Sequence, residues 1–143
     1  MIDQSLTHPA RTVPEEAGDL EHVSAVAARV LRGQDLYREH AADIRFEDGT
    51  WLVPSQHDAT SVYEVTLGRR GEFCECRDFE RRGSACKHVH AAQIARAKTA
   101  RCAGCGARFP RREIVEVHED HENLTWFVGD ELCRSCGIAH GIL

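Results

Sequence analysis

The sequence predicts a small α+β fold in which an N-terminal helix precedes two compact modules built around hairpins. The apolar residues follow a helical spacing early in the chain and then change to strand-like alternation. All seven cysteines lie in the second half of the chain and fall into two groups. The 143 residues include only two Trp, two Tyr and five Phe. Because so few aromatic side chains can form only a small core, we expect part of the stability to come from another source.

The first 43 residues predict an arm, a helix and a linker. Residues 1–16 include two prolines and no apolar period, so we expect a disordered arm. Residues 17–43 should form an amphipathic helix and a linker, with Arg29 and Arg32 late in the helix and Gly33 just after its end. We expect the apolar stripe to pack on the following sheet. It consists of Leu20, Val23, Ala27, Val30 and Leu31.

Residues 44–98 predict two hairpins followed by a helix. Asp48-Gly49 links two alternating runs, and such a two-residue link is typical of a type I′ hairpin. A second hairpin joins Tyr63–Leu67 to Phe73–Cys76. Ser84 can then cap a helix that runs from residue 85 to about residue 98.

Residues 99–143 predict a third hairpin between two cysteine pairs. Its strand-like runs are residues 113–117 and 124–128, and a polar loop connects them. The tail from residue 138 to residue 143 allows barely one further helical turn.

The cysteines fall into two groups, each of which offers four ligands to one ion. The spacing C-x-C-x9-C-x-H gives Cys74, Cys76, Cys86 and His88, and the two C-x2-C pairs give Cys102, Cys105, Cys133 and Cys136. Four Cys or His ligands are the usual set of a structural zinc site, so we expect two zinc ions per chain. The glycine after each C-x2-C pair, Gly106 or Gly137, suits a knuckle whose N–H groups point at sulfur. The unit then resembles a zinc ribbon or a treble clef, and the short tail favours the ribbon.

Other interpretations of these residues are less favoured. Redox C-x2-C pairs open a helix in an α/β fold, and iron–sulfur clusters more often use closely clustered cysteines. The start at Met1 shows neither a basic nor an apolar export signal, so we expect a reducing, cytoplasmic location and no disulfides. His90 is the alternative ligand to His88, but a helix rotates about 200° over two residues, so only one can face the metal. We choose His88 because it follows Cys86 within the first turn.

The first group carries a family resemblance. Its context comprises Trp51-Leu52-Val53-Pro54-Ser55, Tyr63-Glu64-Val65, Cys74-Glu75-Cys76-Arg77-Asp78-Phe79, Arg82-Gly83 and Cys86-Lys87-His88-Val89-His90-Ala91. Over about residues 44–98 the chain resembles a SWIM-type zinc finger. The resemblance implies a ββα zinc module that binds DNA or proteins, and it gives no catalytic residue to carry over.

The charge is segregated along the chain. Residues 69–112 hold 12 Lys and Arg against 4 Asp and Glu, whereas the segments before and after are acidic and the net charge is −5. A basic patch of this kind favours nucleic acid as the partner. The candidate contacts are Arg69, Arg70, Arg77, Arg81, Arg82, Lys87, Arg96 and Lys98. The acidic hairpin of the last module favours the alternative, a protein–protein adaptor stabilised by two structural zinc ions.

Catalysis and membrane insertion are not expected. Two closed four-ligand sites leave no open position for water or substrate, and no catalytic triad or phosphate-cradling glycine loop is present. No apolar run approaches the ~18 residues that a membrane span needs. We therefore expect a non-catalytic regulator without a small-molecule substrate.

Overall fold

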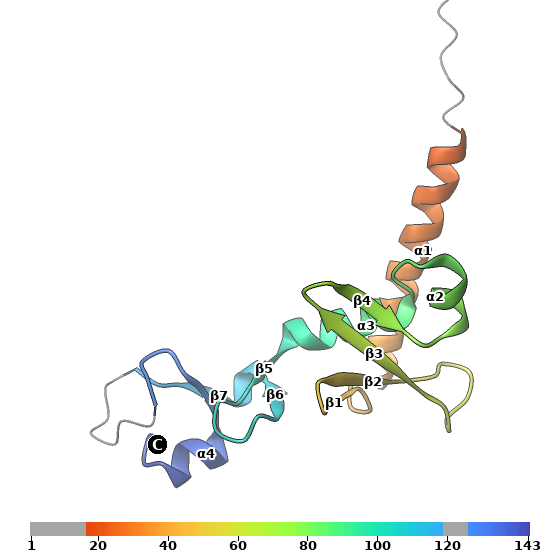
Figure 1. Ribbon diagram of the computed structural model, residues 1–143. Helices are drawn as coiled ribbons and strands as arrows, with labels where there is room; N and C mark the ends of the chain where they lie inside the picture. Colours follow the sequence, from red (N-terminus) through yellow and green to blue (C-terminus); the bar gives the residue numbers. More distant parts are fainter. Residues whose placement is uncertain (1–16, 119–125) are drawn as a thin grey trace, which may run out of the picture.

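The computed structural model describes residues 17–118 and 126–143 (Figure 1). A long helix leads into a sheet and two helices, and a second small unit follows at the other end of the molecule. The predicted arm, residues 1–16, lies outside the described residues. In the part of the chain that is described, no helix is long and apolar enough to cross a membrane.

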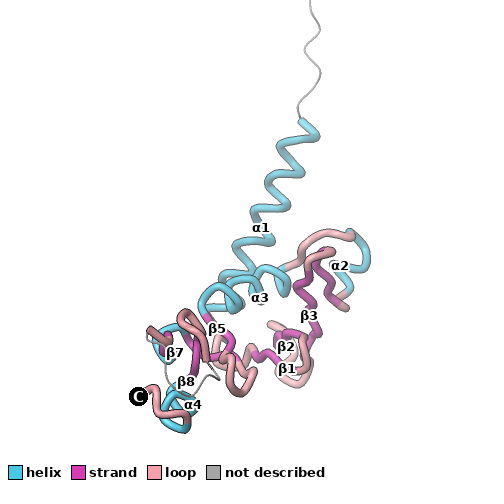
Figure 2. Tube along the Cα trace, turned by 60° about the vertical axis from the view of Figure 1, so that its left-hand side comes forward, coloured by secondary structure: helices cyan, strands magenta, loops and turns pink. Residues whose placement is uncertain are grey.

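Helix α1 (Ala17–His40) is longer than the sequence predicts, because it continues through Gly33. It packs mainly on helix α3 (Lys87–Lys98), as Figure 2 shows, and Leu36 near its end joins the core beside the sheet. A Cβ on Gly33 would lie only 2.4 Å from the Cβ of His90. Gly33 therefore marks the crossing of two helices and not the end of one.

The buried face of α1 also differs from the predicted apolar stripe. Val23 and Leu31 of that stripe are 62% and 60% exposed. Arg29, Gly33 and Leu36 are buried instead, at spacings of four and three residues. The prediction was wrong because the close approach at Gly33 determines which face of α1 meets α3.

Four antiparallel strands form one sheet in the order β1-β2-β3-β4. They are β1 (Arg45–Glu47), β2 (Thr50–Pro54), β3 (Val62–Gly68) and β4 (Gly71–Cys74). Asp48 and Gly49 have φ values of 50° and 84°, which confirms the primed turn between β1 and β2. The predicted second hairpin is confirmed by the pairing of β3 with β4 around Arg69 and Arg70.

Helices α2 (Arg77–Arg82) and α3 follow the sheet. The sequence analysis missed α2, which has only six residues and buries none of them. Helix α3 begins at Lys87 with Cys86 as its N-cap, and not at a cap formed by Ser84. The hydroxyl of Ser84 instead accepts a hydrogen bond from Nη1 of Arg29 at 3.3 Å. The core between the sheet and the helices includes Leu36, Trp51, Val53, Val65 and Val89.

The second unit starts directly after α3. Strands β5 (Thr99–Arg101) and β6 (Arg108–Pro110) pair around the first cysteine knuckle, and a short 3-10 helix (Arg111–Glu113) follows. Strand β7 (Ile114–Glu116) then pairs with β8 (Glu131–Cys133). This small unit has a core of its own around Val117 and Leu132.

The prediction of the third hairpin is therefore correct for its first strand and wrong for its second. Residues 114–116 form a strand as expected, but their partner is β8 and not residues 124–128. Residues 126–128 are not in a strand, and residues 124 and 125 lie outside the described residues. Gly129, with φ of 93°, turns the chain into Asp130, whose carbonyl accepts a hydrogen bond from the N–H of Val117. The pairing of β7 with β8 thus brings Cys133 to the centre of the unit.

Helix α4 (Arg134–Ala139) was not expected from the sequence. It begins immediately after Cys133, so Cys136 lies inside the helix rather than before a tail. The unit thus consists of a knuckle, a hairpin and a helix that carries the last cysteine, an order that fits the treble-clef alternative better than the ribbon. The sequence analysis missed this helix because it considered only a helix that starts after Cys136, where too few residues remain.

Arg108 connects the two units. Its guanidinium lies 5.2 Å from the ring centroid of Trp51 and 5.7 Å from that of Phe46, both in the first module. Its Nη2 also donates to the carbonyl oxygens of Arg96 and Thr99 at 3.0 and 3.1 Å. Arg108 thus links the second unit to the end of α3 and to the sheet, and Nε of Arg111 adds a hydrogen bond to the carbonyl oxygen of Ala97 at 3.2 Å.

Candidate metal centres

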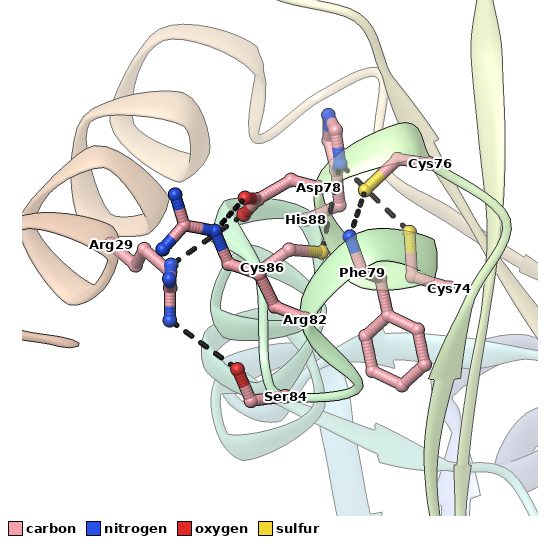
Figure 3. Close-up of polar contacts among 9 residues, drawn as sticks. All are labelled: Arg29, Cys74, Cys76, Asp78, Phe79, Arg82, Ser84, Cys86 and His88. Atoms are coloured by element: carbon pink, nitrogen blue, oxygen red, sulfur yellow. Dashed lines mark hydrogen bonds and ion pairs between the residues drawn. The ribbon is translucent and has the colours of Figure 1, made fainter. Parts of the chain in front are cut away.

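The first centre lies where β4, α2 and α3 meet. Cys74 ends β4, Cys76 and Cys86 are the N-caps of α2 and α3, and His88 is in the first turn of α3. All four side chains are buried, and their ligand atoms lie within 4.8 Å of one another. Figure 3 shows the three sulfurs and the imidazole turned toward one point.

The distances within this group fit a tetrahedral zinc ion. Nδ1 of His88 lies 3.9 Å from Sγ of Cys74 and 3.8 Å from Sγ of Cys86. An imidazole nitrogen at about 2.0 Å and a thiolate sulfur at about 2.3 Å from a zinc ion lie about 3.5 Å apart along an edge of a tetrahedron, so both measured distances are within about 0.4 Å of that edge. Nδ1 of the alternative ligand, His90, instead lies 3.2 Å from Oε1 of Gln93. The structure thus brings His88, and not His90, to the sulfurs.

The proton chemistry of the three thiols also fits a cation. A hydrogen bond from the thiol of Cys74 lowers the pKa of Cys86 to about 3, although burial opposes that shift. The same hydrogen bond and burial raise the pKa of Cys74, and burial raises that of Cys76. Three buried sulfurs cannot all be charged beside one another unless a positive ion compensates them. A bound Zn²⁺ supplies that compensation.

The second centre is formed by the C-terminal unit. Cys102 follows β5, Cys105 is in the knuckle, Cys133 ends β8 and Cys136 is in α4, with ligand atoms again within 4.8 Å. The close packing extends to Gly104, where a Cβ would lie 3.0 Å from Sγ of Cys136. The sequence analysis did not single out Gly104, because only the folded unit brings it near Cys136.

Backbone donors surround the sulfur of Cys102, as the knuckle predicts. Burial alone would raise its pKa, but backbone N–H groups of Cys105, Cys133 and Gly104 lower it to about 6. Gly106 adopts the expected positive φ of 75°. Gly137 does not, because it lies within α4. The thiolate form that a metal requires is therefore stabilised at Cys102 by the fold itself.

The basic residues predicted to contact nucleic acid occupy three places. Arg69 and Arg70 form the β3–β4 turn. Arg77, Arg81 and Arg82 lie on α2, and Arg82 lines the same pocket as Lys87, the first residue of α3. Arg96 and Lys98 are in the last turn of α3. The third place extends into the second unit. There, burial lowers the pKa of Arg108, as do the nearby charges of Arg111, Arg96 and Arg101. The fold thus gathers basic side chains from both modules.

Two basic residues were missed as candidates. Arg29 and Arg32, on α1, line a pocket beside the first centre together with Arg82 and Lys87. The sequence shows them only as arginines late in a helix, a position that the helix dipole favours for any cation. Their relation to the metal centre depends on where α1 crosses α3.

Residues 63–96 match the family model of the SWIM zinc finger. The match spans the second hairpin, α2 and most of α3, and it includes all four ligands of the first centre. No curated protein matches the chain significantly. No solved structure does so either. The protein therefore contains a SWIM zinc finger and a second four-cysteine group, and the two groups fit two zinc ions.

Proposed function

We propose that the protein is a non-catalytic regulator that binds nucleic acid through its basic SWIM module. One observation carries this proposal. Among the residues that the structure describes, Arg82 is the only one of the eight candidate contacts that forms an ion pair with a carboxylate. If the basic patch served only to balance the acidic flanks, these side chains would be paired within the chain. Arginines that form no such pairs are instead suited to phosphate.

The metal centres have a structural role in this proposal. Bound zinc would fix the ends of β4, α2 and α3 relative to one another, and binding energy in such modules is folding energy. Each centre has four protein ligands, which leaves no position for a reacting water. The chain's own residues make the contacts: the guanidinium groups of Arg77 and Arg81 are exposed on α2 and would donate to phosphate oxygens.

The proposal is tested by gel shifts with the zinc-loaded full chain on single- and double-stranded DNA and RNA at two salt concentrations. The variant Arg77→Gln/Arg81→Gln should weaken binding to all sequences alike. The slope of log affinity against log salt should fall by about 0.9 for each duplex phosphate that the variant no longer neutralises. The matched control is Arg38→Gln/Arg45→Gln, which removes two exposed arginines that are paired with Asp35 and Glu47. A wild-type chain that retards no nucleic acid at low salt, with both zinc ions bound, would contradict the proposal.

A protein–protein adaptor is the second candidate. It is favoured by exposed apolar side chains in the second unit, where Phe127 and Ile138 are 72% and 59% exposed. A cavity of about 760 Å³ lies in the same unit and is lined in part by Phe109, Ile138 and Leu143. This candidate takes the lead if the gel shifts show no retardation.

A further inference from the structure

A pocket of about 670 Å³ lies beside the first metal centre, where α1 passes the SWIM module. Its polar wall has four permanent cations, Arg29, Arg32, Arg82 and Lys87, and one carboxylate, Asp78. Three of the zinc ligands, Cys76, Cys86 and His88, form another part of the lining. Because Arg29 and Arg32 come from α1, outside residues 63–96, the pocket is not contained in the SWIM segment itself.

The single carboxylate is shared by two arginines (Figure 3). Nε of Arg82 lies 3.0 Å from one oxygen of Asp78, and Nε of Arg29 lies 3.6 Å from the other. The side chain of Arg29 is only 7% exposed, and its one hydrogen bond to a described residue goes from Nη1 to Ser84. A guanidinium has five N–H donors. Arg29 is therefore a buried cation that has more N–H donors than hydrogen bonds to described residues.

The other two cations have no carboxylate partner among the described residues. Nζ of Lys87 donates to Oε1 of Gln56 at 3.1 Å, which holds the ammonium group in place without neutralising it. Arg32 is exposed at the rim, one turn of α1 beyond Arg29. Both side chains can therefore turn toward an anion without first breaking an ion pair.

The charges of the pocket do not balance. A zinc ion with three thiolates and a neutral imidazole carries about −1. Four cations, Asp78 and the loaded centre then leave the pocket at about +2. A phosphate monoester carries about −1.5 to −2 near pH 7 and offers three strong acceptor oxygens. Arginine and lysine are the side chains that bind such a group.

We propose that this pocket is a phosphate-binding site in which Arg32 and Lys87 contact the phosphate oxygens. Arg29 supplies the buried positive charge beneath them, and Asp78 competes with the ligand for Arg29 and Arg82. The volume is in the range that holds a molecule of nucleotide size. The source of the phosphate rests on the proposed function: it is a nucleic-acid strand or its phosphorylated end, and a free nucleotide has the same chemistry.

The test measures binding of inorganic phosphate to the zinc-loaded full chain by calorimetry. Arg32→Gln and Lys87→Gln should each weaken binding by about tenfold, the effect expected of removing one charge-assisted hydrogen bond. Asp78→Asn should strengthen binding, because it removes the competing carboxylate. The matched control Arg38→Gln removes an exposed arginine of the same helix that is paired with Asp35 and should change nothing. Zinc content is measured on every variant so that an unfolded chain is not mistaken for an altered pocket.

A second experiment identifies the source of the phosphate. One single-stranded oligonucleotide is compared with and without a 5′-phosphate, and adenosine monophosphate is used as the free nucleotide. A preference for the 5′-phosphorylated strand supports a pocket for strand ends. Equal binding of both strands that is weakened alike by Arg32→Gln supports a pocket for a backbone phosphate. Tighter binding of the mononucleotide than of either strand supports a nucleotide site.

The two proposals fail in different ways. A wild-type chain that binds no inorganic phosphate, or variants that all bind like the wild type, would overturn the pocket. In that case, salt-dependent binding of nucleic acid that is sensitive to Arg77 and Arg81 would still support the proposed function. Conversely, phosphate binding that depends on Arg32 and Lys87, in a chain that retards no nucleic acid, would retain the pocket and reject the proposed function.

Discussion

Replacing Gly33 by alanine should destabilise the protein, although alanine is the better helix former. A Cβ at this position would lie 2.4 Å from Cβ of His90, 2.9 Å from the carbonyl oxygen of Lys87 and 3.3 Å from the amide nitrogen of Ala91. In a free helix the substitution would gain up to about 1 kcal/mol. Overpacking typically costs about 1–3 kcal/mol, and the contacts here are with atoms that cannot rotate away. We therefore expect a net destabilisation of about 1–2 kcal/mol.

The measurement is urea unfolding of the zinc-loaded full chain, followed by circular dichroism. Gln34→Ala is the control, because Gln34 is the exposed neighbour of Gly33 on α1 and should change the free energy of unfolding by less than about 0.5 kcal/mol. A Gly33→Ala protein that is more stable than the wild type would refute the reasoning. It would mean that α1 does not approach α3 at this residue.

Three further substitutions test other parts of the structure. Gly49→Ala should cost about 1 kcal/mol in urea unfolding through backbone strain alone, because φ is 84° and no atom lies within 4 Å of the added Cβ; an unchanged stability would argue against the primed turn. Arg108→Lys should cost about 1–3 kcal/mol and alter tryptophan fluorescence, because lysine cannot keep both the contact with Trp51 and the paired hydrogen bonds; a change no larger than that of Arg101→Lys would contradict this role. Cys86→Ala should remove one zinc and unfold the first module while the second centre keeps its ion, since each unit has its own core; release of both ions together would show that the units fold as one.

The features that the sequence predicts correctly depend on residues close together in the chain. Asp48-Gly49 specifies its turn through the φ values that these two residues tolerate. The C-x-C and C-x-H pairs place ligands at adjacent element ends, so Cys74 and Cys86 could be assigned to one centre before the fold was known. Helical geometry likewise allows only one of His88 and His90 to face the metal, and the position of His88 within one turn of Cys86 selects it.

The errors arise where distant segments decide the outcome. Glycine commonly ends a helix, so Gly33 was expected to end α1. The structure instead shows that α1 continues and that Gly33 lies where α1 crosses α3. Ser84 has the properties of a cap, but its hydroxyl accepts a hydrogen bond from Arg29, 55 residues away. The apolar run at residues 124–128 is a plausible strand in isolation, yet β7 pairs with the strand that brings Cys133 to the centre. None of these partners is visible in a local pattern.

Native mass spectrometry of the purified full chain tests the central claim, which is that the chain holds two separate zinc centres. The seven cysteines and His88 form two sets of four ligands within 4.8 Å, so the mass should exceed that of the metal-free chain by two zinc ions. Elemental analysis of the same sample should find zinc and no iron. A single bound zinc, or iron with visible absorption, would contradict the account.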